Sequence, residues 1–134
     1  VQTCALPISA SRPAPPVKRL IEAGIRVCSG SDGIRDTWGP YGNADMLERA
    51  MFVGLRNNFR RDDELAIALD VCTAQGARVM ELDGYGVTEG CKADLLMVPG
   101  ESLADAVVTR SPKRRVIKAG RIVARDGASI MKAP

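Results

Sequence analysis

The sequence predicts an α/β segment followed by a smaller, mainly β segment. A helical pattern, a glycine and a short β-branched run follow one another within residues 17–29, which is typical of one αβ unit. From Gly84 onward, turn residues and short strand patterns replace helical spacing. The chain has 134 residues, 46% of them hydrophobic, so it is long enough for one ordinary domain.

The αβ unit begins after a proline-rich loop. Val17, Leu20 and Ile21 recur at helical spacing, and Gly24 stands where a helix C-terminal glycine usually stands. Residues 25–29, "IRVCS", then predict a buried strand. The Gly-rich stretch "GSDGIRDTWGPYGN" after it predicts a long loop.

Three helices are predicted after this loop. Asn43 is expected to cap the first and Asp45 to lie in its first turn, while Arg49 falls mostly outside its apolar face. Asp62 is expected to cap the second, and Thr73 to begin a short third helix. The predicted apolar faces are Leu47, Ala50, Met51, Gly54 and Leu55 in the first helix, and Leu65, Ala68, Leu69 and Cys72 in the second.

The β segment is predicted to contain a strand at 93–98, a short helix or turn at 101–110 and a β-hairpin within "RRVIKAGRIVARDG". The hairpin strands are joined by the tight turn Ala119–Gly120.

Composition excludes several classes of protein. The formal net charge is only +3 and the aromatic residues are scattered, which disfavours a nucleic-acid surface. No apolar run approaches the ~18–20 residues that a membrane span needs, so we expect a soluble, cytoplasmic protein. The four cysteines form no C-x-x-C pair and are expected to be free thiols. Without histidine, no Ser–His relay and no His-rich metal site can be completed within this chain.

The N-terminus is interpreted separately. Residues 1–9, "VQTCALPIS", show no strand or helix periodicity and resemble a translated sequencing adapter. We therefore interpret residues 1–11 as an artefactual or disordered tail, and expect the natural protein to continue upstream of Ser11.

Asp32, in "GSDG", is the main candidate for chemistry. In parallel α/β folds the loops after strands carry the functional groups, and a carboxylate there can bind a divalent metal and exchange protons with water. Trp38 in the same loop could stack on a flat substrate. Two alternatives stay open, namely an ordinary Asp–Gly turn and a Gly-rich phosphate cradle that lacks a P-loop lysine. Asp36 is most simply a carboxylate that stabilises the loop or that supports a metal ligand from behind.

The loop "GIRVCSGSDGIRDTWGPYGNADMLERA" resembles the last barrel strand and following loop of the amidohydrolase superfamily, most closely its cytosine deaminase group. The stretch "GYGVTEGCKADLLMVPGESLADAV" and the hairpin resemble the tail of the same superfamily. The resemblance implies the C-terminal part of a TIM (β/α)8 barrel at 12–83, with its last strand and helices. It implies part of the small β-sandwich domain at 84–134.

The resemblance also assigns roles. Asp32 matches the aspartate that binds the metal and shuttles protons, and Trp38 matches a tryptophan at the substrate pocket. The implied cofactor is a zinc or iron ion of the full-length enzyme, with no metal held by this chain alone. The implied reaction is hydrolytic deamination of cytosine or a related cyclic amidine. The implied partner is a pyrimidine-like small molecule, with no nucleic acid or membrane, and a homo-oligomer of the full-length enzyme is allowed.

One position departs from this pattern. The cytosine deaminases carry a second acidic residue directly after the ligand aspartate, where this chain has Gly33. This favours a different pyrimidine, a triazine or another cyclic amidine as substrate. The alternatives are hydrolysis of an amide or cyclic ureide, and a small non-enzymatic α/β binding module in which Asp32 is a turn residue.

Overall fold

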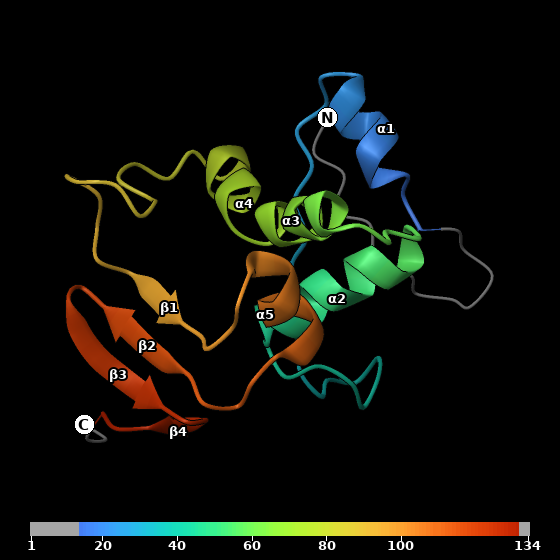
Figure 1. Cartoon of the computed structure of the whole chain (residues 1–134). Helices are drawn as coiled ribbons and strands as arrows, with labels where there is room; N and C mark the ends of the chain where they lie inside the picture. Colours follow the sequence, from blue (N-terminus) through green and yellow to red (C-terminus); the bar gives the residue numbers. More distant parts are fainter. Residues whose placement is uncertain (1–13, 132–134) are drawn as a thin grey trace.

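The computed structural model of the protein describes residues 14–131 (Figure 1). Helices gather on one side and a small antiparallel sheet lies on the other, with α5 between them. The predicted combination of helices and strands is therefore confirmed, and the prediction for residues 1–11 lies outside the described residues. The described helices are α1 (Val17–Glu22), α2 (Met46–Arg56), α3 (Asp62–Val71), α4 (Ala74–Val79) and α5 (Leu103–Thr109), and the strands are β1 (Leu95–Met97), β2 (Arg115–Lys118), β3 (Arg121–Arg125) and β4 (Ala128–Ser129).

Two small apolar clusters hold the helices together. In the first, Val71 at the end of α3 packs with Val27 and with residues of α1. In the second, Val107 of α5 packs against Leu47 and Ala50 of α2. Because α5 follows residue 83, the two predicted segments share this second cluster. The domain boundaries themselves stay a prediction.

Residues 25–29 do not form the predicted strand. Val27 is buried, as a core strand requires, but no strand ladder pairs with this segment within the described part of the chain. The Ser29 N–H donates to the carbonyl oxygen of Val71 at 2.9 Å, which is the end of a helix. A strand needs a neighbouring backbone that satisfies its N–H and C=O groups, and helices lie beside this one. The prediction that residues 25–29 form the last strand of a barrel is therefore wrong for this structure. Whether the longer protein contains a TIM barrel stays a prediction.

The cap of α2 differs from the predicted one. Asp45, not Asn43, is the N-cap, and its Oδ1 accepts hydrogen bonds from the N–H groups of Leu47 (3.0 Å) and Glu48 (3.4 Å). The Asn43 side chain instead accepts from the Asp45 N–H at 2.8 Å. Ala44 has φ +58°, so the chain leaves helical geometry before Asp45 and the helix cannot begin earlier.

The start of α3 also shifts by one residue. Arg61 occupies the N-cap position and Asp62 is the first helical residue, so the predicted Asp62 cap is wrong. Glu64 Oε2 accepts from the N–H groups of Arg60 (2.9 Å) and Arg61 (3.3 Å), so it reaches back to the N-cap backbone as the glutamate of a capping box does. Thr73 precedes α4 as predicted.

The sheet confirms the predicted β segment. Its strands run antiparallel in the order β1-β2-β3-β4, with Leu95 opposite Ile117 and Ile117 opposite Ile122. Ala119 (φ +47°) and Gly120 (φ +75°) form the turn between β2 and β3. Two successive positive φ angles match the right-handed twist of a two-residue hairpin, which explains why local sequence predicted it.

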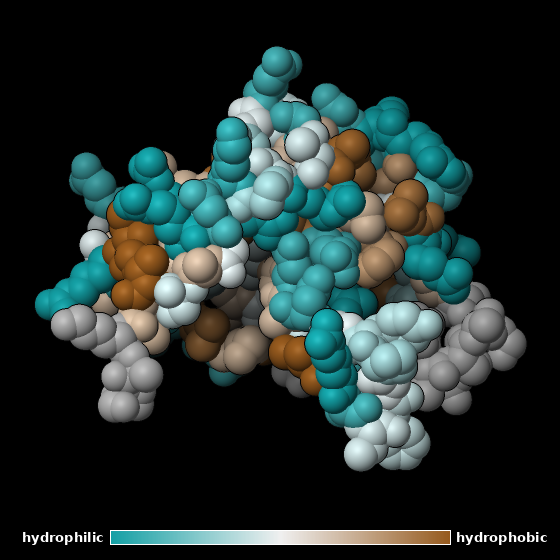
Figure 2. Space-filling view, turned by 90° about the horizontal axis from the view of Figure 1, so that it is seen from below, coloured by the Kyte–Doolittle hydropathy of each residue, from teal (hydrophilic) through white to brown (hydrophobic). Residues whose placement is uncertain are grey.

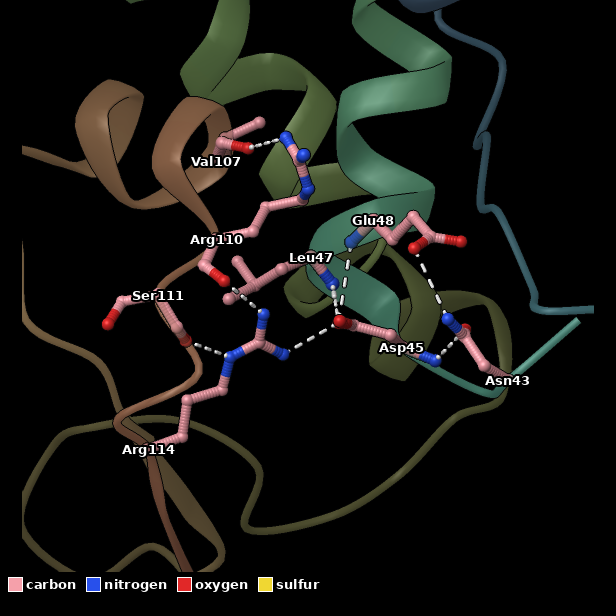
Figure 3. Close-up of polar contacts among 8 residues, drawn as sticks. All are labelled: Asn43, Asp45, Leu47, Glu48, Val107, Arg110, Ser111 and Arg114. Atoms are coloured by element: carbon pink, nitrogen blue, oxygen red, sulfur yellow. Dashed lines mark hydrogen bonds and ion pairs between the residues drawn. The ribbon is translucent and has the colours of Figure 1, made fainter. Parts of the chain in front are cut away.

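An ion pair fastens the β segment to the start of α2 (Figure 3). Arg114 Nη1 lies 2.8 Å from Asp45 Oδ1, and the same guanidinium donates to the carbonyl oxygens of Ser111 (2.6 Å) and Arg110 (2.9 Å). Burial alone would raise the pKa of the Asp45 carboxyl. The hydrogen bond from Arg114 and those from the helix N–H groups outweigh burial and lower that pKa.

Much apolar surface stays exposed. Figure 2 shows hydrophobic atoms among polar ones on the face seen from below, including a group on the side where the sheet lies. No helix within residues 14–131 is both long and apolar enough to cross a membrane. Apolar side chains with more than half of their surface exposed include Leu55, Met80, Val87, Leu103, Val108 and Met131.

Candidate functional site

The loop that carries Asp32 is held by α2 and by the end of α3. The Ser29 N–H donates to the Val71 carbonyl at 2.9 Å, and Arg49 Nη2 donates to the Ser31 carbonyl at 2.6 Å. In Figure 1 this loop emerges beside α2. Asp32 therefore comes directly after two tertiary anchors.

Asp32 is exposed and its backbone is left-handed. Its φ is +60°, which is uncommon for a residue other than glycine. Ser31 Oγ donates to the Asp32 carbonyl at 3.2 Å, whereas the Asp32 carboxylate accepts no hydrogen bond from residues 14–131. An ordinary turn aspartate tolerates a positive φ and accepts backbone hydrogen bonds through its side chain. At "SDG" the φ of Asp32 fits a turn, but its carboxylate accepts no such bond from the described residues and is available to an external group.

Asp36 plays the loop-stabilising part that the sequence predicted for it. Its Oδ1 accepts from the N–H groups of Trp38 (2.9 Å) and Gly39 (3.2 Å). Its Oδ2 lies against Gly33, so closely that a Cβ at position 33 would come within 1.7 Å of it. Any side chain at residue 33 would therefore displace the Asp36 carboxylate.

The loop between residues 33 and 42 closes on itself. A Cβ at Gly42, whose φ is +99°, would lie 2.0 Å from the Gly33 carbonyl oxygen, and the Arg35 N–H donates to the Tyr41 carbonyl at 2.9 Å. Trp38 lies between these closures and is 90% exposed. The backbone thus presents the indole to solvent.

The structure places Asp32 and Trp38 in one loop but does not bring them to one cavity. An open hollow of about 560 Å³ is lined by residues 35–40, including Trp38. Asp32 does not line it. The role of Trp38 as a wall of the substrate site stays a prediction.

The described part of the chain, residues 14–131, does not assemble a metal site from its own side chains. No group of three His, Cys, Asp or Glu side chains within the described range is arranged to hold an ion, and the sequence contains no histidine. A catalytic zinc usually takes three protein ligands. Asp32 is an exposed oxygen donor of the required type, but alone it does not fit a complete centre.

Cys72 does not offer an alternative nucleophile beside this loop. Cys28, Cys72 and Cys91 form no disulfide, as predicted, and Cys4 lies outside the described residues. Burial raises the pKa of the Cys72 thiol to about 11. A thiol with such a pKa is protonated at neutral pH and is a poor nucleophile.

Arg49 is the residue that the sequence did not predict at this site. Helical periodicity placed it off the apolar face, yet its side chain is half-buried and reaches the loop. The sequence feature that could have indicated this contact is an arginine on the helix that directly follows a candidate catalytic loop. That signal is weak, because the same spacing also suits a solvated arginine.

Comparison with known proteins decides the family. The model of the amidohydrolase family matches residues 7–124. This chain belongs to the amidohydrolase family. Family membership sets aside the alternative of an unrelated small binding module.

Individual amidohydrolases show the same relationship. The chain is 37% identical to N-isopropylammelide isopropyl amidohydrolase of Pseudomonas sp. (strain ADP). The aligned region has 119 residues and covers 88% of this chain. The crystal structure of N-isopropylammelide isopropylaminohydrolase from Burkholderia multivorans matches with a TM-score of 0.86 and 48% identity over 92% of this chain. The structure of 5-methylcytosine deaminase from Klebsiella pneumoniae, liganded with 5-fluorocytosine, matches with a TM-score of 0.74 and 29% identity over 90% of this chain.

The match covers a minority of each relative. The chain spans 30% of the Pseudomonas protein, 32% of the Burkholderia structure and 30% of the Klebsiella structure. About two thirds of each relative's length therefore has no counterpart in this chain.

Proposed function

We propose that this chain is the C-terminal part of a longer amidohydrolase, called the whole enzyme below. The whole enzyme replaces an amino or alkylamino group on a six-membered nitrogen heterocycle by oxygen. The observation that carries this proposal is the similarity to N-isopropylammelide isopropylaminohydrolase, at 48% identity and a TM-score of 0.86. The exposed Asp32, without an internal partner among the described residues, supports it.

The proposed substrate is N-isopropylammelide or a similar alkylamino triazine, rather than cytosine. Identity and structural similarity are both higher for the N-isopropylammelide hydrolase than for 5-methylcytosine deaminase. Gly33 supports the same choice, because the Asp36 carboxylate fills the space that a side chain at position 33 would need. An acidic residue at this position is part of the cytosine deaminase pattern, and here it would have to displace the Asp36 carboxylate.

The proposed reaction is a hydrolysis that needs no oxidant or reductant. Water adds to the ring carbon that bears the isopropylamino group, the carbon–oxygen bond forms, and the carbon–nitrogen bond breaks. Isopropylamine leaves with a proton taken from the water, and the ring keeps the oxygen. The Asp32 carboxylate accepts that proton and returns it to the leaving nitrogen, which is the task of a general acid–base group.

The remaining groups of the centre are proposed to come from outside residues 14–131. A divalent metal, zinc or iron, belongs to this proposal as a cofactor of the whole enzyme, with Asp32 as one of its ligands. Trp38 is proposed to bind the flat ring by stacking, for which its 90% exposure leaves the indole face available.

The test is a substrate panel on the whole enzyme. We expect isopropylamine release from N-isopropylammelide to exceed ammonia release from cytosine and 5-methylcytosine. In Asp32→Asn, kcat should fall by about 10³-fold, because the side chain can no longer accept a proton. The control is Asp126→Asn in the exposed turn after β3, which should keep kcat within about twofold.

Other outcomes would overturn parts of the proposal. Cleavage of an acyclic amide or a cyclic ureide, with no amine released from either heterocycle, would favour the alternative amidohydrolase reaction. Full activity of Asp32→Asn would remove Asp32 from the chemistry.

A further inference from the structure

Arg49 connects helix α2 to the backbone directly before Asp32. Its Nη2 donates to the Ser31 carbonyl oxygen at 2.6 Å, across a separation of 18 residues. We propose that Arg49 is a positioning residue that fixes the Ser31–Asp32 peptide and thereby aims the Asp32 carboxylate. This inference rests on the proposed function of Asp32.

The peptide that Arg49 holds has few other restraints. Upstream, Ser29 is tied to the end of α3 through the Val71 carbonyl. The contact from Ser31 Oγ to the Asp32 carbonyl, at 3.2 Å, is local and moves with the loop. Asp32 itself has φ +60°, a left-handed conformation that is uncommon for residues other than glycine but that aspartate tolerates. Arg49 supplies the direct tertiary contact at this point.

The guanidinium of Arg49 also contacts an aromatic ring of its own helix. Its carbon lies 5.8 Å from the centre of the Phe52 ring, one helical turn along α2. Its Nε is inaccessible to solvent and has no hydrogen-bond partner in the described structure. A buried donor without a partner costs free energy, so a purely structural role would be better served by an apolar side chain. The hydrogen bond to the Ser31 carbonyl explains why a cationic side chain, and not an apolar one, occupies this position.

Cys72 also lies near Arg49. Cys72 is close enough to feel its charge, but burial keeps that thiol protonated at neutral pH. An anion from Cys72 therefore does not compete with the Ser31 carbonyl for the guanidinium.

The test compares Arg49→Met and Arg49→Lys in the whole enzyme, with N-isopropylammelide as substrate. Loss of the contact lets Asp32 move by about an ångström, so Arg49→Met should lower kcat by about 10²-fold with KM changed by less than about threefold. Arg49→Lys keeps a donor and should recover part of this loss. The control, Arg26→Met at an exposed position of the preceding segment, should leave both constants within about twofold.

A double-mutant cycle separates positioning from simple packing. In an Asp32→Asn background, Arg49→Met should have no further effect on kcat, because the group that Arg49 aims has already been disabled. An equal loss in both backgrounds, or wild-type kcat in Arg49→Met, would overturn the proposal.

A measurement without turnover distinguishes this inference from the proposed function. Amide hydrogen exchange in a peptide covering residues 29–36 should accelerate in Arg49→Met, while exchange in α3 stays unchanged. This holds even if N-isopropylammelide is not the substrate. Unchanged exchange at 29–36 would contradict the positioning role, and global acceleration in Arg49→Met would assign Arg49 to general stability instead.

Discussion

At the residue scale, the Gly33–Asp36 contact sets the shape of the candidate loop. Asp36 uses one carboxylate oxygen for the N–H groups of Trp38 and Gly39 and turns the other toward Gly33. A side chain at residue 33 would therefore have to push the Asp36 carboxylate aside. This constraint does not come from backbone conformation, because the positive φ belongs to Asp32.

This contact predicts the effect of adding a single methyl group. Gly33→Ala would place its Cβ 1.7 Å from Asp36 Oδ2, so the Asp36 carboxylate has to move away. That movement breaks the hydrogen bonds from Trp38 and Gly39 that hold the loop, and we expect kcat/KM of the whole enzyme to fall by about tenfold or more. The measurement is steady-state hydrolysis of N-isopropylammelide.

The chain offers a matched control for that change. Gly30→Ala lies three residues earlier, where an added Cβ meets no atom within 4 Å, and it should change kcat/KM by less than about threefold. Equal losses for Gly30→Ala and Gly33→Ala would show that the Asp36 contact is not the cause.

At the element scale, helix α2 ties the candidate loop to the sheet. Its N-cap Asp45 binds Arg114 from the β segment, and its first turns pack against α5. Helix α2 also carries Arg49, which contacts the loop. Because Asp45 and Arg49 belong to the same helix, we expect that breaking the Asp45–Arg114 ion pair also shifts the contact between Arg49 and the loop.

The Asp45–Arg114 pair predicts a dependence of stability on pH. The pKa of Asp45 is lowered in the folded state, so the stabilisation is complete above the unfolded value near pH 4 and is lost as pH falls below it. Asp45→Asn should lower the thermal midpoint of the whole enzyme at pH 6, and the difference from wild type should shrink below about pH 4.

The control for this prediction is Glu89→Gln, in the exposed loop before β1. It should leave the thermal midpoint close to that of wild type across the same pH range. A difference between Asp45→Asn and wild type that stays constant from pH 6 to pH 3 would contradict the assigned role of the carboxylate charge.

At the scale of the whole molecule, the buried core is small relative to the exposed apolar surface. Val71 and Val107 are the largest side chains that are fully buried in the described part of the chain. Large apolar residues such as Leu55, Leu103 and Val108 are more than half exposed. Surfaces of this kind usually contact other protein.

This surface predicts the behaviour of the isolated 134-residue chain. We expect it to self-associate, and to unfold without a sharp cooperative transition, because little of its apolar surface is buried. Sedimentation and thermal unfolding followed by circular dichroism measure these properties. A monomer with a single cooperative transition would contradict this expectation.

Local features of this fold were predictable from the sequence and tertiary ones were not. The Ala119–Gly120 hairpin was predicted because turn geometry depends on neighbouring residues alone. The strand at 25–29 was not formed, because a strand depends on a partner that lies elsewhere in space. The cap of α2 was misplaced by two residues because Ala44 adopts a left-handed conformation that composition does not reveal.

In the candidate site, too, local features could be predicted from the sequence and tertiary contacts could not. The loop role of Asp36 could be predicted from the motif. The role of Asp32 comes from the resemblance to a family and stays a prediction. Arg49 could not, since the direction of its side chain is set by the position of Ser31 in the folded chain. The hollow at residues 35–40 likewise depends on closure of the loop at Gly33 and Gly42.

The central claim is that Asp32 belongs to a metal-dependent centre completed by residues outside this chain. The most direct test is a crystal structure of the whole enzyme with its metal bound. The account predicts an Asp32 carboxylate oxygen at about 2.0–2.2 Å from the metal, with Arg49 still bound to the Ser31 carbonyl. An Asp32 carboxylate that faces solvent, away from a fully coordinated metal, would contradict it.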